Sequence, residues 1–274
     1  MARDLQGIRV LLTGASRGIG RCLALQLAPM RVQMTLAARS EVALNAVVDE
    51  AKSKGATAHA AVTDVTSDVE RKSLIRRAVE SMGGLDVLIN NAGVASFGHF
   101  DSSSEDVLRK VMEVNFFAPA EMMRLAAPHL MKGNRPAIIN VASICGRVGL
   151  PGWTEHCASK FGIVGLSEAL RGEYSRFDID VLVVMPGLVR SDDLGRHLLR
   201  NEGRMKLNFA GAQPPEEVAV IIIRSLQRNR AETAIGWQAR WLRRAQRFVP
   251  RFVDRMLARK VRQLYPEVSV ARSP

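Results

Sequence analysis

Seven short apolar runs alternate with longer segments of helical periodicity over the first 235 residues, and this alternation constrains the fold most. Most of the runs are continuously apolar, which is typical of strands covered on both faces. The expected strands are 8–12, 33–37, 57–62, 87–90, 137–141, 180–184 and 233–235, and the clearest expected helices are 19–27, 42–54, 69–82, 161–176 and 215–227. Alternation of this kind builds right-handed βαβ units. We therefore predict an α/β fold with a doubly wound parallel sheet, formed as one domain by residues 1–235.

The composition fits a globular chain: 47% of the 274 residues are hydrophobic and 24% are charged. No run approaches the ~18 apolar residues of a membrane span. The first apolar run leads directly into a glycine-rich turn, so we also expect no secretory signal. Cys22, Cys145 and Cys157 lack the spacing of disulfides or metal ligands. We expect no metal site, and a reducing, cytoplasmic setting for these thiols.

The glycine-rich turn, Thr13-Gly14-Ala15-Ser16-Arg17-Gly18-Ile19-Gly20, lies between the first expected strand and the first expected helix. Gly14 permits the tight turn, Gly18 lets backbone amides approach a pyrophosphate, and Gly20 allows close helix–strand packing. The helix start offers N–H groups and a positive dipole end to phosphates. A turn without a ligand is the alternative. The motif predicts a dinucleotide site that includes Gly14, Ser16, Arg17, Gly18, Ile19 and Gly20.

The end of the second expected strand distinguishes NAD from NADP. An acidic residue there usually binds the ribose 2′-hydroxyl of NAD, whereas an arginine accommodates the 2′-phosphate of NADP. The chain has Arg39 at this place and no carboxylate before Glu41, and Arg17 adds a second cation. Two solvated surface arginines are the alternative. We predict NADP(H) as the cofactor, because guanidinium groups bind phosphate strongly.

Further motifs follow the later expected strands in order: Asp64-Val65, then Asn90-Asn91-Ala92-Gly93, then Asn115, Ser143 and Lys160, then Pro186-Gly187. With the turn, they make residues 5–235 resemble the short-chain dehydrogenase/reductase family in its small single-domain form, which has a Rossmann-like fold. The resemblance implies that Asp64 and Val65 border the adenine and that Ser191 lies near the nicotinamide. The other cofactor contacts it implies are Asn91, Ala92, Gly93, Lys160, Pro186, Gly187 and Val189.

The family's chemistry is carried by Ser, Tyr, Lys and Asn, with the pattern Tyr-x-x-x-Lys. The resemblance implies that Ser143 orients a substrate carbonyl, Lys160 holds the nicotinamide ribose, and Asn115 orders water. The chain departs from the pattern at the tyrosine, the family's proton donor, because this position holds His156. The two tyrosines, Tyr174 and Tyr265, are not placed to substitute for it.

The function depends on what His156 does. Histidine can act as an acid or a base, with an unperturbed pKa of ~6.5, but the charge of Lys160 disfavours its protonated form. A neutral ring could still donate one N–H. In one hypothesis His156, with Ser143 and a water, serves an NADP(H)-dependent oxidoreductase that acts on a hydrophobic carbonyl or alcohol. In the other, catalysis is impaired and the chain is an NADP-binding or membrane-associated interaction protein. An engineered change that blocks turnover is a third reading.

Residues 188–211 form a long segment before the next expected helix, and we predict a lid over the substrate. Basic residues alternate in it with Leu, Met and Phe, which suits an amphipathic helix. Its apolar side would face either the pocket or the core. The expected pocket wall consists of Val94, Ser96, Ile144, Val148 and Trp153.

The charge is concentrated near the C-terminus. Residues 1–223 contain 26 Lys/Arg and 24 Asp/Glu, whereas residues 224–262 contain 12 and two. Residues 237–264 combine arginines with Trp, Phe, Leu, Val and Met at helical spacing, and Pro250 should divide them into two helices. We predict that residues 236–274 form a basic amphipathic helical tail. Its apolar side would meet either an anionic membrane surface or protein.

We expect no nucleic-acid partner, because the tail lacks a recognised fold for one and charge alone specifies none. By analogy with relatives we expect a homo-oligomer that contacts its copies through residues 105–131 and 158–176. The expected location is the cytoplasm, with the tail allowing a peripheral membrane position.

Overall fold

In the computed structural model, residues 2–190, 198–201 and 211–264 are described. Their core is a seven-stranded sheet in the order β3-β2-β1-β4-β6-β7-β9, with every pair of neighbours parallel. The strands are β1 (Arg9–Thr13), β2 (Gln33–Ala38), β3 (Thr57–Val62), β4 (Val87–Asn90), β6 (Ala137–Val141), β7 (Asp180–Pro186) and β9 (Glu232–Ile235). The prediction of a doubly wound parallel sheet is confirmed.

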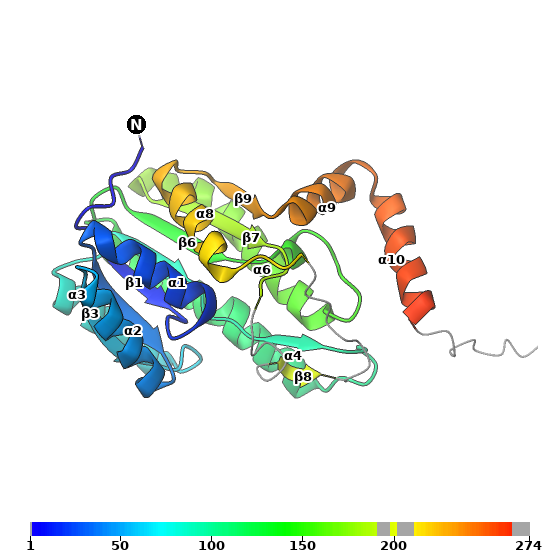
Figure 1. Cartoon of the computed structure of the whole chain (residues 1–274), viewed down its shortest axis with the longest axis horizontal. Helices are drawn as coiled ribbons and strands as arrows, with labels where there is room; N and C mark the ends of the chain where they lie inside the picture. Colours follow the sequence, from blue (N-terminus) through cyan, green and yellow to red (C-terminus); the bar gives the residue numbers. More distant parts are fainter. Residues whose placement is uncertain (1, 191–197, 202–210, 265–274) are drawn as a thin grey trace, which may run out of the picture.

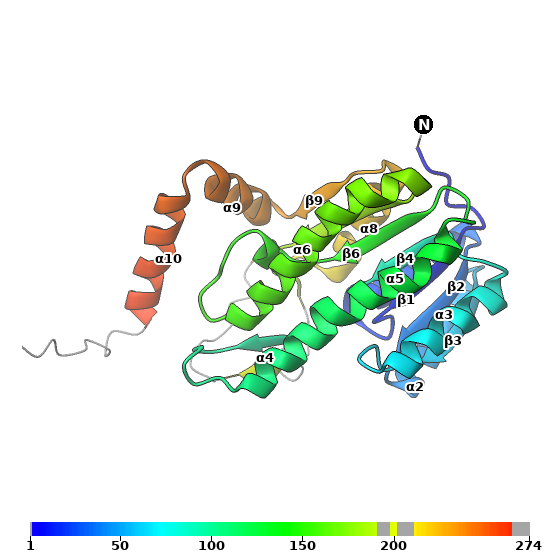
Figure 2. The same cartoon turned by 180° about the vertical axis from the view of Figure 1, so that it is seen from behind.

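Helices cover both faces of the sheet, because alternate strand residues point to opposite sides. Val10 and Leu12 pack toward one apolar cluster, and Leu11 packs toward the other. On the first face lie α1 (Gly18–Leu27), α2 (Glu41–Ser53) and α8 (Pro215–Gln227), seen in front of the sheet in Figure 1. On the second lie α3 (Asp68–Met82), α5 (Ala118–Leu130) and α6 (Thr154–Tyr174), seen in Figure 2.

The order of the strands reverses at β1, whose neighbours are β2 on one side and β4 on the other. In open α/β sheets, ligands bind at such a switch point, beyond the carboxyl ends of the strands. The loops that follow β1 and β4 carry the glycine-rich turn and the Asn91-Ala92-Gly93 motif. The topology therefore brings the two motifs to one edge of the sheet.

A buried polar ladder joins β4, β6 and α6. The Asn90 Nδ2 atom donates to the Asn140 Oδ1 atom at 2.9 Å, and the Asn140 Nδ2 atom donates to the Ser167 Oγ atom at 2.8 Å. All three side chains are buried. Because buried amides need hydrogen-bond partners, the ladder favours a single alignment of these elements.

Two local predictions need correction. Helix α6 begins at Thr154 rather than near residue 161, so His156 and Lys160 lie four residues apart on one helix. The expected lid helix is wrong for Leu198–Asn201, which forms strand β8 and pairs with β5 (Ala95–Phe97). That pairing satisfies backbone groups that a helix would have satisfied internally. Residues 191–197 and 202–210 of the predicted lid lie outside the described residues.

Helix α4 (Glu105–Met112) continues through a π-helical turn, η2 (Glu113–Phe117), into α5. Three short 3₁₀ segments occur at η1 (Ala28–Met30), η3 (Ile144–Gly146) and η4 (Ser175–Phe177).

The tail forms two helices, α9 (Trp237–Phe248) and α10 (Pro250–Leu264), at the β9 edge of the sheet (Figure 1). Their junction confirms the expected break at Pro250. In the described part of the chain, no helix has the length and hydropathy needed to cross a membrane.

Candidate functional site

The glycine-rich turn requires glycine at two places for different reasons. Gly14 has φ +68°, and a Cβ atom there would lie 2.8 Å from the Cα atom of Ala92. A Cβ atom on Gly20 would lie 2.1 Å from the Gly14 carbonyl oxygen, so α1 packs directly on the turn. Among the residues that the structure describes, nothing lies within 4 Å of a Cβ atom built on Gly18, and no side chain caps the start of α1. The amides at this helix start are therefore placed to bind an anion.

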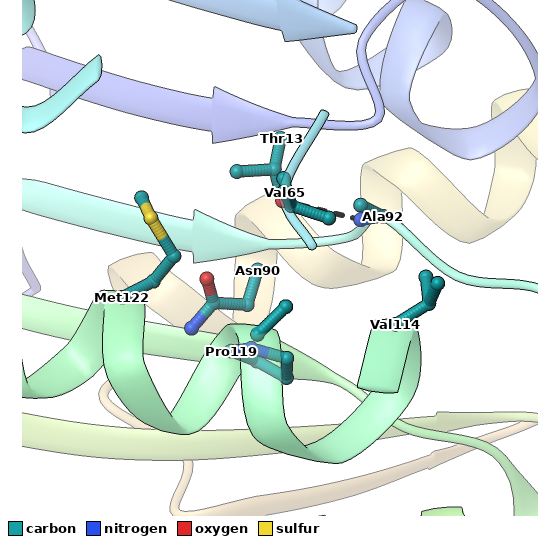
Figure 3. A pocket seen from close by; sticks show the side chains of 8 residues that line it. Thr13, Val65, Asn90, Ala92, Val114, Pro119 and Met122 are labelled. Carbon is teal, nitrogen blue, oxygen red and sulfur yellow. Dashed lines mark hydrogen bonds between the residues drawn. The ribbon is translucent and has the colours of Figure 1, made fainter. Parts of the chain in front are cut away.

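Side-chain hydrogen bonds fix the turn to the end of β4. The Asn91 Nδ2 atom donates to the carbonyl oxygens of Thr13 and Gly14, at 3.1 and 3.0 Å. The Thr13 hydroxyl accepts from the backbone N–H groups of Asn91 and Ala92. Figure 3 shows the bond between Thr13 and Ala92 beside Val65, all three lining a small pocket that α5 closes with Pro119. The turn is thus held in place by the protein alone.

Asp64 lies where the adenosine end of a cofactor is expected. Its Oδ1 atom accepts from the backbone N–H and the hydroxyl of Thr66, at 2.9 and 2.8 Å. Burial opposes ionisation of Asp64, but these bonds and the charges of Arg39 and Lys110 outweigh it and lower its pKa. Asp64 is therefore a carboxylate at neutral pH. Asp64 and Arg39, two of the expected cofactor residues, are thus close enough to interact electrostatically.

Asn115 is buried in the π-helical turn, a distortion that often marks functional sites. Its Oδ1 atom accepts from the N–H of Val94, and its Nδ2 atom donates to the Val94 carbonyl and the Ser159 hydroxyl, at 2.9, 2.8 and 3.0 Å. A Cβ atom on Gly93 would lie 3.3 Å from Asn115 Oδ1 and 3.8 Å from Lys160 Nζ. Asn115 therefore connects the loop after β4 to α6.

Lys160 and Ser143 are held by backbone groups at the end of β6. The buried Lys160 Nζ atom donates to the Val141 carbonyl at 3.0 Å. Burial lowers the pKa of Lys160 to about 8, and the influence of Cys145 opposes this in part. Lys160 is therefore mostly a cation at pH 7. The Ser143 Oγ atom accepts from the Cys145 N–H at 3.2 Å, which leaves the hydroxyl proton for another acceptor.

His156 is a neutral base in this environment. Burial and then the charge of Lys160 lower its pKa to about 3, although the hydrogen bond with Val94 opposes the shift. The Nδ1 atom lies 3.3 Å from the Val94 carbonyl oxygen. Because a carbonyl only accepts, this contact is a hydrogen bond in the tautomer that carries its proton on Nδ1. The other nitrogen, Nε2, then has a lone pair and no proton. In this arrangement the neutral ring does not offer the free N–H that the sequence reasoning considered.

The other expected residues are placed as follows. Pro186 ends β7, the Gly187 N–H donates to the Ile235 carbonyl, and Val189 pairs with Gln213. Ser191 and Tyr265 lie outside the described residues, and Tyr174 packs on Phe177 near the other end of α6. Several residues of the expected pocket wall are enclosed by protein, among them Ile144, which is buried against the tail. Ser96 is buried with its hydroxyl on Glu155, and Val148 is buried against the tail.

Sequence reasoning missed the roles of three residues. Thr13 braces the turn, Val94 joins Asn115 to His156, and Ser159 receives the Asn115 amide. Thr13 could have been found, because it begins the turn motif. Val94 and Ser159 left no signal, since Val94 acts through its backbone and a serine on a helix is common.

Among the described residues, no cluster of three or more His, Cys, Asp or Glu side chains could hold a metal.

Similarity to known proteins agrees with this geometry. The sequence model of the family described as short chain dehydrogenase matches residues 9–201. The ketoacyl reductase HetN of Nostoc sp. is 31% identical over 232 residues, which cover 85% of this chain and 79% of that protein. The 3-oxoacyl-[acyl-carrier-protein] reductase FabG of Staphylococcus aureus is 38% identical over 184 residues, which cover 66% and 74%.

Solved structures give the same assignment. A short chain dehydrogenase/reductase from Burkholderia phymatum, in complex with NAD, superposes with a TM-score of 0.77 at 25% identity, covering 85% of this chain and 90% of that one. A short-chain alcohol dehydrogenase described as putative, from Sinorhizobium meliloti, gives a TM-score of 0.66 at 32% identity, covering 69% and 75%. These matches favour an enzyme over a protein that only binds a nucleotide. The chain belongs to the short-chain dehydrogenase/reductase family of oxidoreductases.

Proposed function

We propose that this protein is an NADP(H)-dependent oxidoreductase that interconverts a hydrophobic carbonyl compound and its alcohol. The observation that carries the proposal is the convergence of the phosphate-binding turn with Asn115, Ser143, His156 and Lys160 at one edge of the sheet. The residues fit a dinucleotide, since α1 starts uncapped beside the open space at Gly18. When bound, the nicotinamide supplies or accepts the hydride.

The preference for NADP(H) rests on Arg39 and Arg17. Both are exposed at the edge where the adenosine end is expected, and the Asp64 carboxylate near Arg39 is already engaged by Thr66. Because its side chain is exposed, Arg39 can bind a 2′-phosphate, which an arginine can contact with two parallel hydrogen bonds. Asp64 and Val65 would border the adenine.

In the proposed mechanism, the Ser143 hydroxyl donates a hydrogen bond to the substrate oxygen and so orients the reacting carbon. The Lys160 ammonium holds the ribose of the nicotinamide and stabilises negative charge on the substrate oxygen. Asn115 positions α6 and the loop after β4, in addition to its expected role with water. The proton moves at His156 Nε2, which accepts it from an alcohol during oxidation.

Reduction is the reverse of that step, so the proton must come from the protonated His156 ring. With a pKa of about 3, only a small fraction of the ring is protonated at neutral pH. We therefore propose that ketone reduction is slow at neutral pH and accelerates as the pH falls. Alcohol oxidation uses the form of the ring that predominates.

The proposed substrate carries an acyl or similar apolar chain next to the reacting carbonyl. The matches to HetN, a ketoacyl reductase, and to the 3-oxoacyl-[acyl-carrier-protein] reductase FabG support this class. We further propose a homo-oligomer, supported by the exposure of Phe117 beside α5 and of Phe161 on α6. The three free, buried cysteines support a cytoplasmic location.

The test is a pair of measurements on the purified chain. Calorimetric titration with NADPH and NADH should show binding, with NADPH bound more tightly; absence of binding by both would refute the cofactor assignment. Reduction of medium-chain ketones and 3-oxoacyl thioesters should then consume NADPH. If His156 is the donor, log kcat/KM for reduction should fall by about one unit per pH unit between pH 5 and 8. A flat profile would assign the proton to another group.

A further inference from the structure

The tail helices have two apolar stripes, and within residues 2–190, 198–201 and 211–264 only one of them is covered by protein. Ala239, Leu242 and Ala245 of α9, with Val253 and Leu257 of α10, pack against Ile144, Val148 and Leu150 after β6. Ala239 also meets Gly187, since a Cβ atom on that glycine would lie 3.5 Å from the Ala239 Cβ atom. This stripe fixes the tail to the domain and explains why these apolar residues recur at helical spacing.

The second stripe is exposed and aromatic. Trp237, Trp241 and Phe248 are 70%, 47% and 74% exposed. At about 100° per residue, these three positions fall within about 40° of one another on α9, opposite the buried Ala239. Phe252 and Met256, one turn apart on α10, are exposed as well. Large apolar side chains gathered in this way mark an interaction surface.

The charge around this stripe is almost entirely positive. Residues 237–264 contain eight arginines and one lysine, with Asp254 as the single acidic residue. Within the described part of the chain, Arg243 bonds to Glu232, whereas most of the other basic residues in α9 and α10 have no acidic partner. Arg240, Arg244 and Arg247 lie beside the α9 aromatics, and Arg255 and Arg259 lie beside Phe252. The surface is thus suited to an anionic partner.

We propose that α9 and α10 bind the surface of an anionic lipid bilayer. Trp237, Trp241, Phe248, Phe252 and Met256 would enter the interfacial region, where aromatic rings are favoured, while the arginines contact lipid phosphates. Several basic residues beside an anionic leaflet also attract it electrostatically. The helices would lie in the plane of the surface, and the α/β domain would remain in water.

A second copy of this chain fits the surface less well. Pairing by a two-fold axis would bring the same patch together from both subunits and place arginine against arginine. Such like-charge contacts are unfavourable unless acidic groups intervene, and Asp254 alone cannot balance them. The tail also follows β9, the last strand of the central sheet, and lies outside the match to the family's sequence model.

The test is sedimentation of the full chain with vesicles. Vesicles of pure phosphatidylcholine are compared with vesicles in which part of the lipid is phosphatidylglycerol, at low and high salt. We expect binding at least about tenfold stronger to the anionic vesicles, and weaker binding in high salt. No binding, or equal binding to both kinds of vesicle, would overturn the proposal.

Two double variants locate the contact. Trp237→Ser with Trp241→Ser, and Arg244→Glu with Arg251→Glu, should each reduce vesicle binding at least about tenfold. The matched controls, Val42→Ser with Val69→Ser and Lys52→Glu with Arg76→Glu, change exposed residues of α2 and α3 and should bind normally. An equal loss in the controls would contradict the assignment.

Thermal unfolding and light scattering complete the test. Each variant should keep the unfolding midpoint of the parent chain, because the changed side chains are exposed. If the tryptophan variant instead loses subunits at unchanged vesicle binding, the stripe is a contact between copies and the membrane proposal is wrong.

Discussion

The two ends of the candidate site are held in different ways. At the carboxyl ends of β1 and β4, hydrogen bonds among Thr13, Gly14, Asn91 and Ala92 fix the turn. At the start of α6, the one hydrogen bond of the His156 ring among the described residues is to the Val94 carbonyl, at 3.3 Å. The geometry of the cofactor end is therefore fixed by hydrogen bonds between the two loops. The activity of the proton-transfer end depends on the protonation state of one ring. Binding and chemistry should respond separately to mutation.

The largest expected effect is at the proton-transfer end. His156→Tyr would restore a phenol beside Lys160, whose charge lowers a neighbouring tyrosine's pKa. General acid catalysis is worth about 10²–10⁴ in rate, so ketone reduction at pH 7 should rise by about that factor. Steady-state kinetics with NADPH checks this. The NADPH dissociation constant should not change, and His156→Phe is the control, with no gain in rate. A rate unchanged by tyrosine would show that the proton donor at position 156 does not limit reduction.

At the cofactor end, Gly20→Ala should have the next largest effect. Its Cβ atom would lie 2.1 Å from the Gly14 carbonyl oxygen, so α1 must move away from the turn. We expect NADPH binding to weaken by about 100-fold, because the phosphate contacts depend on that packing. Calorimetry measures the change. Gly165→Ala, where a Cβ atom meets nothing within 4 Å, is the matched control and should bind normally.

Replacement of one charge should alter the choice of cofactor without altering the chemistry. Arg39→Asp should weaken NADPH binding by about 10- to 100-fold, since a charge-assisted hydrogen bond contributes about 1.5–3 kcal/mol. NADH binding should be equal or stronger, because an acidic residue suits the 2′-hydroxyl. Arg76→Glu, on the exposed side of α3, should leave both unchanged. An equal loss of NADPH and NADH affinity would indicate that Arg39 supports the fold.

The smallest expected effect is on stability. The pKa of His156 in the folded chain, about 3, is below its ordinary value of 6.5, so the unfolded chain takes up this proton first. Stability is therefore lost as the pH falls below about 7. Between pH 7.5 and 5.5 we expect a loss of about 1.4 kcal/mol. Urea unfolding of the parent and of His156→Gln would measure it, because the variant should lack this pH-dependent loss. An identical pH dependence would place His156 in contact with water.

The fold was predictable because it depends on patterns that the sequence displays directly. The expected strands 87–90 and 137–141 coincide with the observed ones, since they are buried throughout and mostly apolar, as strands covered on both faces are. The expected strand 57–62 coincides as well, although β3 is an edge strand with exposed and buried residues intermixed. The small β5–β8 pair was not predictable, because Ala95–Phe97 is only three residues long and its partner is distant in sequence. The first turn of α6 was missed, because Trp153 gives no capping signal at its start.

Much of the candidate site was predictable for a different reason. Gly14, Asn91 and Lys160 belong to local motifs, and the topology alone brings those motifs together. The effect of Lys160 on the pKa of His156 was predictable from their spacing, whereas the larger effect of burial and the contact with the Val94 carbonyl were not. Every residue carries a backbone carbonyl, so a sequence does not show which carbonyl will contact a given side chain. The same limit applies to the tail, whose pattern did not reveal that one stripe would be buried and the other exposed.

The ladder from Asn90 through Asn140 to Ser167 determines how strictly this enzyme must fold. If β6 slipped by one residue along β4, the Asn140 amide would turn to the other face and lose its hydrogen bonds to Asn90 and Ser167. The same slip would carry Ser143, three residues downstream, by about 3.3 Å relative to the β4 loop. A sheet with this wrong register would lose buried hydrogen bonds, and its catalytic residues would also be displaced. The hydrogen bonds of these three side chains thus favour both the correct strand register and the correct position of Ser143.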